Sequence, residues 1–228
     1  MTKLKGILLT EGMHGMISQV EGLAKALDIN YSHHTVETKG FWKVIPPKFT
    51  PISDSVFKKI ECEDVDLIIS CGRKSIIPSL FLKKNSKKKV FNIHIQNPKI
   101  KLDNFDLVVV PEHDNLDGDN VLKTKGAIHY LTSEEIEKDK EYLFSISSKL
   151  KDKNIISLII GGPTQYYDYS DRNIQEIFSK VNYLVKENNL NLVVIPSMRT
   201  PKGTIEHAKI YFGNDHLVLD SVDKKAYL

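Results

Sequence analysis

The stretch Ile155-Ile-Ser-Leu-Ile-Ile-Gly-Gly-Pro-Thr164 decides the fold of this chain. Its leading residues are mostly β-branched or apolar and predict a strand buried on both faces, as in a parallel sheet. Gly161 and Gly162 then allow a tight turn and a close approach of the backbone to a ligand. Asp171 is placed to cap a helix over about 172–187. A strand, a glycine turn that includes Thr164, and a helix N-terminus together predict an anion site.

The residues before this strand predict a domain boundary. Segment 134–153 is highly charged, has a helical pattern and ends in a Lys-Asp-Lys-Asn turn, which is typical of a connection between domains. A length of 228 residues with 41% apolar content allows one large or two modest domains. We therefore predict an N-terminal domain over 1–150 and a C-terminal domain over 151–228.

Composition excludes several classes of protein. The formal net charge of +3 is small beside 32 basic and 29 acidic side chains, so it gives no reason to expect a nucleic-acid partner. Cys62 and Cys71 are too few for a disulfide framework or a metal cluster. No apolar run approaches the roughly 18 residues that span a bilayer. We expect a cytoplasmic protein, at most peripheral to a membrane, with no metal or other cofactor.

The first half alternates predicted strands, at 4–10, 29–37, 66–71, 90–95, 105–110 and 121–123, with helices that include 53–59 and 74–84. This order predicts right-handed crossovers and a parallel sheet with helices on both faces. Such sheets bind ligands beyond the carboxyl ends of their strands. The polar residues that follow these strands are therefore candidate ligand contacts: Gly12, His14, Gly15, Gln19, Arg73, Gln96, His113 and Asp114.

The second half repeats the pattern. A predicted strand at 190–196 leads into Ser197-Met-Arg-Thr-Pro201, where Thr200 suits an N-cap and Pro201 the first helical position. Ser197 and Arg199 would then lie beside free helix amides. A short strand at 217–219 and a helix after Ser221 follow. Three strands make about half of a nucleotide-binding fold, so we expect a shortened, apparently truncated C-terminal domain.

Several motifs also have structural interpretations. Gly12 and Gly15 suit a plain strand-to-helix turn, Arg73 an ion pair with a helix carboxylate, and the His113-Asp114 pair an ordinary capped turn.

The remaining aromatic and basic segments have two interpretations each. Trp42, in the aromatic segment 40–47, either packs on the sheet or faces a partner. The basic run 83–89 is most often a solvated loop, and alternatively attracts anionic lipid. The tyrosine cluster 166–169 either stacks on a base or sugar or is simply exposed.

Other nucleotide-binding classes lack their motifs here. No tyrosine has a lysine four positions later, as short-chain dehydrogenases and epimerases require. The three-glycine dinucleotide fingerprint, the P-loop pattern and zinc-ligand spacing are also missing.

A resemblance covers nearly the whole chain. The order and spacing of these motifs resemble the mitochondrial fission ELM1 family, whose bacterial members are often described as nucleoside-diphosphate-sugar enzymes and look like two-domain GT-B glycosyltransferases. The motifs are Gly12 with Gly15, Gln19 and Gly22-Leu-Ala24; Ser70-Cys-Gly-Arg73; Gln96-Asn-Pro98; Pro111-Glu-His-Asp114; Gly118-Asp-Asn120; Gly161-Gly162; and Ser197-Met-Arg-Thr-Pro201.

The resemblance implies a nucleotide-sugar donor held by the second domain and an acceptor held by the first. Gly161, Gly162 and Arg199 would cradle the diphosphate, since a guanidinium can clamp two oxygens at once. Transfer needs a base on the acceptor hydroxyl, for which His14 is the first candidate and His113-Asp114 the second. The family's association with organelle fission implies an alternative, a non-catalytic scaffold linked to membrane or organelle morphology.

Overall fold

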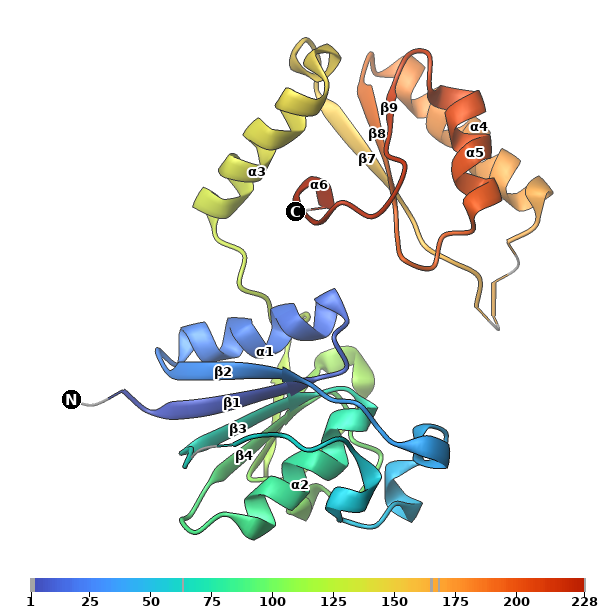
Figure 1. The fold of residues 1–228 in the computed structure, drawn as a ribbon. Coiled ribbons are helices and arrows are strands. Elements are labelled where there is room, and N and C mark those ends of the chain that lie inside the picture. The colour runs from blue at the N-terminus through green and yellow to red at the C-terminus, as the bar shows by residue number, and fades with distance from the viewer. Residues whose placement is uncertain (1–2, 63, 165, 168, 228) are drawn as a thin grey trace. The chain divides into compact units, whose positions relative to one another are not determined.

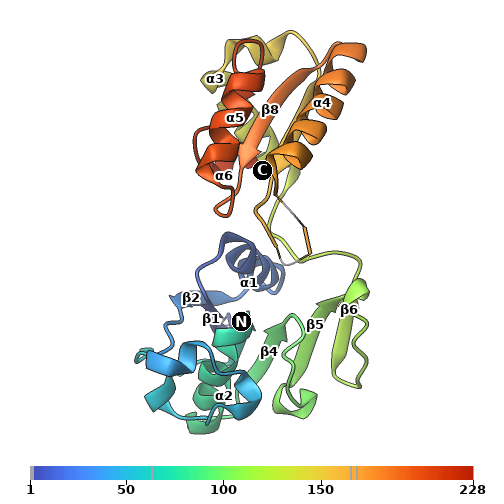
Figure 2. The same ribbon diagram turned by 90° about the vertical axis from the view of Figure 1, so that its right-hand side faces the viewer.

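The computed structural model describes residues 3–62, 64–164, 166–167 and 169–227 (Figures 1 and 2). The chain divides into two compact units, Met1–Tyr130 and Leu131–Leu228. This division precedes the boundary expected after residue 150. The reason is that helix α3 (Ser133–Ile146) packs its Leu143 and Phe144 against the core of the second unit. The charged helix is thus part of the second unit rather than a connection ahead of it.

The first unit is built on a six-stranded parallel sheet, as the sequence predicts. The strands follow the order β2-β1-β3-β4-β5-β6, and every neighbouring pair is parallel. The carboxyl ends of the strands therefore share one edge of the sheet. The strands are β1 (Lys5–Thr10), β2 (Asn30–Thr35), β3 (Leu67–Cys71), β4 (Phe91–Ile95), β5 (Leu107–Pro111) and β6 (Val121–Thr124).

Helices cover both faces of this sheet (Figure 1). Helix α1 (His14–Ala26) packs Val20 and Ala24 against Leu8 and the β3–β4 side chains on one face. Helix α2 (Ile76–Asn85) packs on the other face, against a core that includes Ile7. Successive residues of a strand point to opposite faces, so two adjacent residues of β1 enter two different cores.

Between β2 and β3 the chain makes an excursion of short 3₁₀ turns, η1 (Gly40–Lys43), η2 (Pro47–Phe49) and η3 (Asp54–Val56). The prediction of a helix at 53–59 is therefore wrong. The chain at this point is extended, because Phe57 forms an antiparallel bridge with Thr38 and enters the core. Trp42 packs against the same core, which confirms the packing interpretation.

The second unit has a three-stranded parallel sheet in the order β7-β8-β9. Helices α4 and α5 pack on one face. Helix α3, the 3₁₀ turn η7 (Ser148–Lys151) and α6 contribute to the core on the other face. The elements are β7 (Ile155–Ile160), α4 (Asp171–Glu187), β8 (Asn191–Pro196), α5 (Lys202–Phe212), β9 (Leu217–Val218) and α6 (Lys224–Tyr227).

Strand β7 is not buried on both faces, contrary to prediction. It lies at an edge of the sheet, and Ile159 is 50% exposed. The central strand is β8, of which all six residues are buried. A mostly apolar run thus predicted a strand of this sheet correctly but did not distinguish the edge from the centre.

Among the described residues, no helix combines the length and the apolar character that crossing a bilayer requires.

Candidate functional site

One threonine hydroxyl ties together the turns that follow β7 and β8. Oγ1 of Thr200 lies 2.6 Å from the carbonyl oxygen of Ile160 and 2.9 Å from that of Gly161. The same oxygen accepts a hydrogen bond from the N–H of Ser197 at 2.8 Å. As an acceptor the hydroxyl closes the turn after β8, and as a donor it links that turn to the end of β7.

Gly162 and Arg199 are in direct contact across these two turns. A β-carbon added to Gly162 would lie 2.3 Å from the carbonyl oxygen of Arg199 and 2.5 Å from its Cβ. Any other residue at position 162 would therefore displace the main chain that carries the guanidinium. Gly162 is buried, whereas Arg199 is exposed. The structure thus brings together the glycine pair and the arginine that the sequence singles out.

Tyr169 joins this group, and the sequence did not assign it a binding position there. Its hydroxyl lies 3.8 Å from the position that a β-carbon on Gly161 would take. Burial raises the pKa of Tyr169, and the positive charge of Arg199 acts in the opposite direction. The only signal in the sequence was the tyrosine cluster, because a loop of this length does not reveal which of its side chains folds back.

The loop after Gly162 does not lead directly into a helix. The hydroxyl of Thr164 accepts hydrogen bonds from the N–H groups of Tyr166 and Tyr167, both at 3.2 Å, and this closes a separate turn. Helix α4 begins at Asp171 with Ser170 at the N-cap position. The expectation that Asp171 caps the helix is therefore wrong, and α4 carries a carboxylate in its first turn.

The helix terminus that follows the β8 turn is a better place for an anion. Helix α5 begins at Lys202 with Pro201 at the N-cap position, and its first turn has no acidic residue. The predicted cap by Thr200 is wrong, because its hydroxyl is turned toward the end of β7. Without a side-chain cap, the amides at the start of α5 are suited to a negative ligand.

In the first unit, the turn after β1 is built on Thr10 and Gly12. The buried hydroxyl of Thr10 accepts a hydrogen bond from the N–H of Gly12 at 3.1 Å and contacts Nε2 of His33 at 2.9 Å. Gly12 has φ +83°, a conformation that favours glycine. His14 and Gly15, both exposed, begin α1. The side-chain amide of Gln19 donates a hydrogen bond to the carbonyl oxygen of Gly15, so in this structure it is bonded within helix α1.

A carboxylate from the turn after β1, that of Glu11, binds the turn after β3, which no pattern in the sequence predicts. Oε1 of Glu11 accepts the N–H of Lys74 at 3.0 Å, and its Oε2 lies 3.1 Å from Nζ of Lys74. Glu11 therefore occupies the anion position before α2. Arg73, beside it, donates from Nη2 to the carbonyl oxygen of Lys43 at 2.8 Å, which fastens the aromatic excursion. Burial raises the pKa of the nearby Cys71 thiol to about 12, and the negative charge of Glu11 acts in the same direction.

The candidate residues after β4 and β5 form a second group on the same edge. Gln96 has φ +88°, an uncommon conformation for a residue with a β-carbon, and its N–H donates to the carbonyl oxygen of Val109. His113 and Asp114 lie in η6 (Glu112–Asp114), with Nε2 of His113 3.8 Å from Oδ1 of Asp114. Strands β1 and β5 are separated by β3 and β4, which places their ends about 14 Å apart. His14 and His113 are therefore alternatives rather than a pair.

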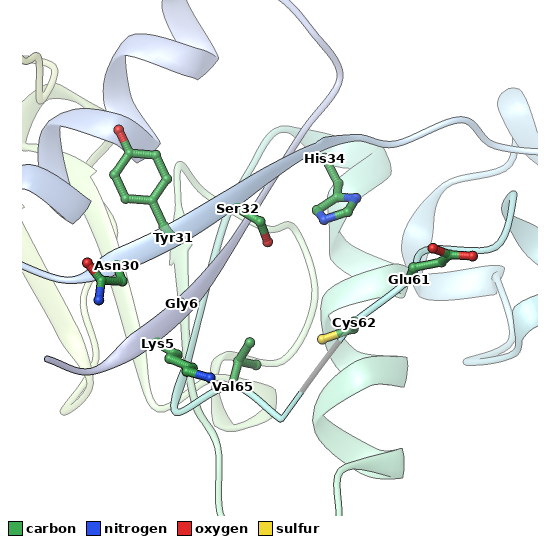
Figure 3. A pocket seen from close by; sticks show the side chains of 9 residues that line it. All are labelled: Lys5, Gly6, Asn30, Tyr31, Ser32, His34, Glu61, Cys62 and Val65. Carbon is green, nitrogen blue, oxygen red and sulfur yellow. The ribbon is translucent and has the colours of Figure 1, made fainter. Parts of the chain in front are cut away.

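A pocket of about 520 Å³ lies away from this edge (Figure 3). Lys5 and Asn30 at its rim begin β1 and β2. Figure 3 shows Ser32 and His34 pointing toward the segment that carries Cys62, whereas Tyr31 points to the other side of the sheet. The pocket lies along the edge strand β2, from Asn30 to His34, and beside the amino ends of β1 and β3, so it is separate from the turn residues of the predicted ligand edge.

Over the described part of the chain, no three His, Cys, Asp or Glu side chains converge as a metal ion would require.

Comparisons with known proteins identify relatives of this chain. The family model described as Mitochondrial fission ELM1 matches residues 14–228. The mitochondrial fission protein ELM1 of Arabidopsis thaliana is 35% identical over 48 residues, which are 21% of this chain and 11% of that protein. That match therefore spans about a tenth of the relative's length.

Two solved structures of similar fold are a UDP-GlcNAc 2-epimerase and a complex with UDP. The UDP-GlcNAc 2-epimerase of Methanocaldococcus jannaschii matches 98% of this chain and 74% of its own, with a TM-score of 0.56 and 12% identity. The S. aureus MnaA–UDP co-structure matches 98% and 70%, with a TM-score of 0.53 and 16% identity. These likenesses confirm the expected fold class, α/β with two Rossmann-like parallel-sheet units of GT-B type.

Proposed function

This chain belongs to the mitochondrial fission ELM1 family, and from that premise we propose that it binds a nucleotide-diphosphate sugar at the carboxyl ends of β7 and β8 and acts as a glycosyltransferase. The observation that carries the proposal is the contact between Gly162 and the main chain of Arg199, locked by the hydroxyl of Thr200. This contact places a glycine turn and an arginine side chain at the ends of adjacent strands. A diphosphate can bind there, because the turn lets it approach the backbone and the guanidinium offers paired donors to its oxygens.

The chemistry of the second unit supports diphosphate binding. The guanidinium of Arg199 offers two parallel N–H donors to phosphate oxygens. The uncapped start of α5, with Lys202 in its first turn, adds favourable amides and a positive charge. The hydroxyl of Tyr169, beside Gly161, can donate a hydrogen bond to the ligand or accept one from it. In a transfer reaction the same positive charges would stabilise the leaving diphosphate.

The first unit supplies the proposed acceptor contacts. His14 at the start of α1 is the proposed base that takes the proton of the acceptor hydroxyl, and His113 with Asp114 is the alternative. The positive φ of Gln96 supports a role for that edge of the sheet, because uncommon backbone conformations of non-glycine residues concentrate at functional sites.

Titration of the full chain with UDP-, GDP- and ADP-sugars tests the binding step. We expect one nucleotide class to raise the unfolding temperature, as a ligand of the folded state does. Arg199→Ala should weaken that ligand at least tenfold without changing the stability of the free protein, and Arg199→Lys should recover part of the loss. Lys186→Ala, at the opposite end of α4, is the matched control and should bind as the parent chain does.

Transfer is tested separately by release of nucleoside diphosphate in the presence of candidate acceptors. His14→Asn should lower turnover by about 10² to 10⁴ while leaving nucleotide affinity unchanged. If His113→Asn has that effect instead, the base is the alternative one. If no sugar nucleotide stabilises the protein and Arg199→Ala is silent, the non-catalytic scaffold replaces the enzyme as the function.

A further inference from the structure

The excursion between β2 and β3 exposes an unusual group of large apolar side chains. Phe41 is 65% exposed, Val44 73%, Phe49 68% and Ile52 41%. Single exposed apolar residues are ordinary on a protein surface, but several within one short loop mark an interaction site. We name the segment 39–52 the apolar loop.

The apolar loop is held in place at its base. The N–H of Lys39 donates to the carbonyl oxygen of Val56 at 2.7 Å, and that of Lys58 donates to Glu37 at 2.8 Å. Between them, Thr38 and Phe57 form an antiparallel bridge. The loop projects beyond the carboxyl end of β2 (Figure 1). Its exposed side chains are thus displayed by an anchored segment.

Two contacts within the loop fix its inner side. Trp42 packs against the core, and the carbonyl oxygen of Lys43 accepts the hydrogen bond from Arg73. The space beneath, lined in part by Trp42 and Ile77, amounts to only about 20 Å³. The loop is therefore not a lid over a cavity, because its underside is already filled.

The charge of the apolar loop has one sign. Lys39, Lys43 and Lys48 alternate with the apolar residues, and segment 39–52 contains no aspartate or glutamate. Nζ of Lys48 lies 4.8 Å from the centroid of the Phe49 ring. Just outside the loop, the carboxylate of Glu37 is paired with Lys58 at 2.6 Å, which reduces its repulsion of an approaching anion.

We propose that the apolar loop docks the protein on an anionic lipid bilayer. The aromatic and aliphatic side chains enter the boundary between headgroups and acyl chains, and Lys43 and Lys48 face lipid phosphates, while Nζ of Lys39 donates to the carbonyl oxygen of Asp54 at 3.1 Å. Apolar residues interleaved with cations are the composition that binds this boundary, since one part is buried in hydrocarbon while the other meets the negative surface potential. A bilayer accepts a convex projection without a preformed complementary groove.

Trp42 gives a direct readout, because it is the single tryptophan of the chain and lies within the loop. The full chain is mixed with phosphatidylcholine vesicles, with or without phosphatidylglycerol, and examined by co-sedimentation and by tryptophan emission. We expect binding to the anionic vesicles, weaker binding at high salt, and quenching of the emission by brominated acyl chains, because the centroid of the Trp42 ring lies 4.3 Å from that of the exposed Phe41 ring.

Matched variants locate the contact. Phe41→Ser with Phe49→Ser should weaken vesicle binding more than tenfold, whereas Phe91→Ser with Ile210→Ser, which also removes two exposed apolar side chains, should not. Lys43→Gln with Lys48→Gln should weaken it too, whereas Lys101→Gln with Lys125→Gln, with the same loss of charge, should not. Circular dichroism and the unfolding temperature establish that each variant is folded.

Two results would overturn the proposal. One is the failure of the parent chain to bind anionic vesicles at low salt. The other is binding that the loop variants retain in full with no change in Trp42 emission, which would assign the contact to another surface such as the basic run 83–89. Sugar-nucleotide affinity of the Phe41→Ser, Phe49→Ser variant should be unchanged in either case, so this test is independent of the proposed function.

Discussion

The main chain of Arg199 lies against the α-carbon of Gly162, so close that a β-carbon there would be 2.3 Å from the Arg199 carbonyl oxygen. This contact fixes the separation of two turns that follow adjacent strands. The glycine is required by packing, since the neighbouring turn occupies the place where any other side chain would start. For Gly161, one residue earlier, the nearest atom among the described residues is the Tyr169 hydroxyl, at 3.8 Å from the β-carbon position.

Gly162→Ala should therefore be much more damaging than Gly161→Ala. Overpacking of this kind typically costs about 1 to 3 kcal/mol, and it would shift Arg199 away from a bound diphosphate. Thermal unfolding and calorimetric titration with the stabilising sugar nucleotide measure the two effects. Equal behaviour of both alanine variants would contradict the contact between the turns.

Thr200→Val should distinguish the contribution of the Thr200 hydroxyl to stability from that of the side-chain volume. Valine fills the same volume but leaves the N–H of Ser197 without its acceptor and removes the donor to Ile160 and Gly161. We expect a loss of about 1 to 3 kcal/mol in the free energy of unfolding and weaker nucleotide binding. Thr200→Ser keeps the hydroxyl and should lose much less. Denaturant unfolding of the three proteins, compared at one pH, decides the point.

Glu11→Ala should destabilise the first unit by about 1 kcal/mol, because the carboxylate accepts the N–H of Lys74 at the start of the turn before α2. Glu11→Gln keeps an oxygen acceptor and should lose only part of that amount. Chemical denaturation checks the order of the three proteins. A glutamine variant as unstable as the alanine variant would assign the effect to the ion pair with Lys74 Nζ.

His94 should make stability depend on pH. Burial lowers the pKa of its imidazole from 6.5 to about 3, and the ring is held by the Ser70 hydroxyl at 2.9 Å. As the pH falls below 6.5, His94 is protonated in the unfolded chain but stays neutral in the folded chain, so the free energy of unfolding decreases. From about pH 7.5 to about pH 5, the free energy of unfolding should fall by about 2 kcal/mol.

The control for this pH dependence is His94→Gln, which should be less stable at neutral pH but show a shallower slope between those pH values. Burial also lowers the pKa values of His33 and His216, so part of the slope should remain. An unchanged slope in the glutamine variant would exclude His94 as the main titrating group.

Much of the fold could be read from the sequence because strand and helix periodicity are local. The strands at 67–71, 91–95 and 191–196 lie within a residue of their predicted positions. The parallel direction of the strands in the first sheet was predicted from the alternation of strands and helices, whereas their order in the sheet was not. The turn residues after those strands are also located by sequence alone, which is why the candidate residues lie at the shared carboxyl edge.

The failures involve contacts between distant segments. Segment 53–59 has a pattern compatible with a helix, but the bridge between Phe57 and Thr38 holds it extended. Thr200 has the chemistry of an N-cap, but the carbonyl groups at the end of β7 take its hydroxyl instead. Glu11 was overlooked because its partner, Lys74, is 63 residues away along the chain.

The sequence by itself determined the class of fold, two parallel-sheet units, and the family, because periodicity, turn residues and motif order are properties of a linear chain. Only the tertiary structure decided which of those residues act together. It placed Arg199 on Gly162, turned Thr200 and Tyr169 toward Gly161, exposed one side of β7 and displayed the apolar loop. These outcomes depend on the packing of segments remote in sequence, and the local preferences of each segment do not contain that information.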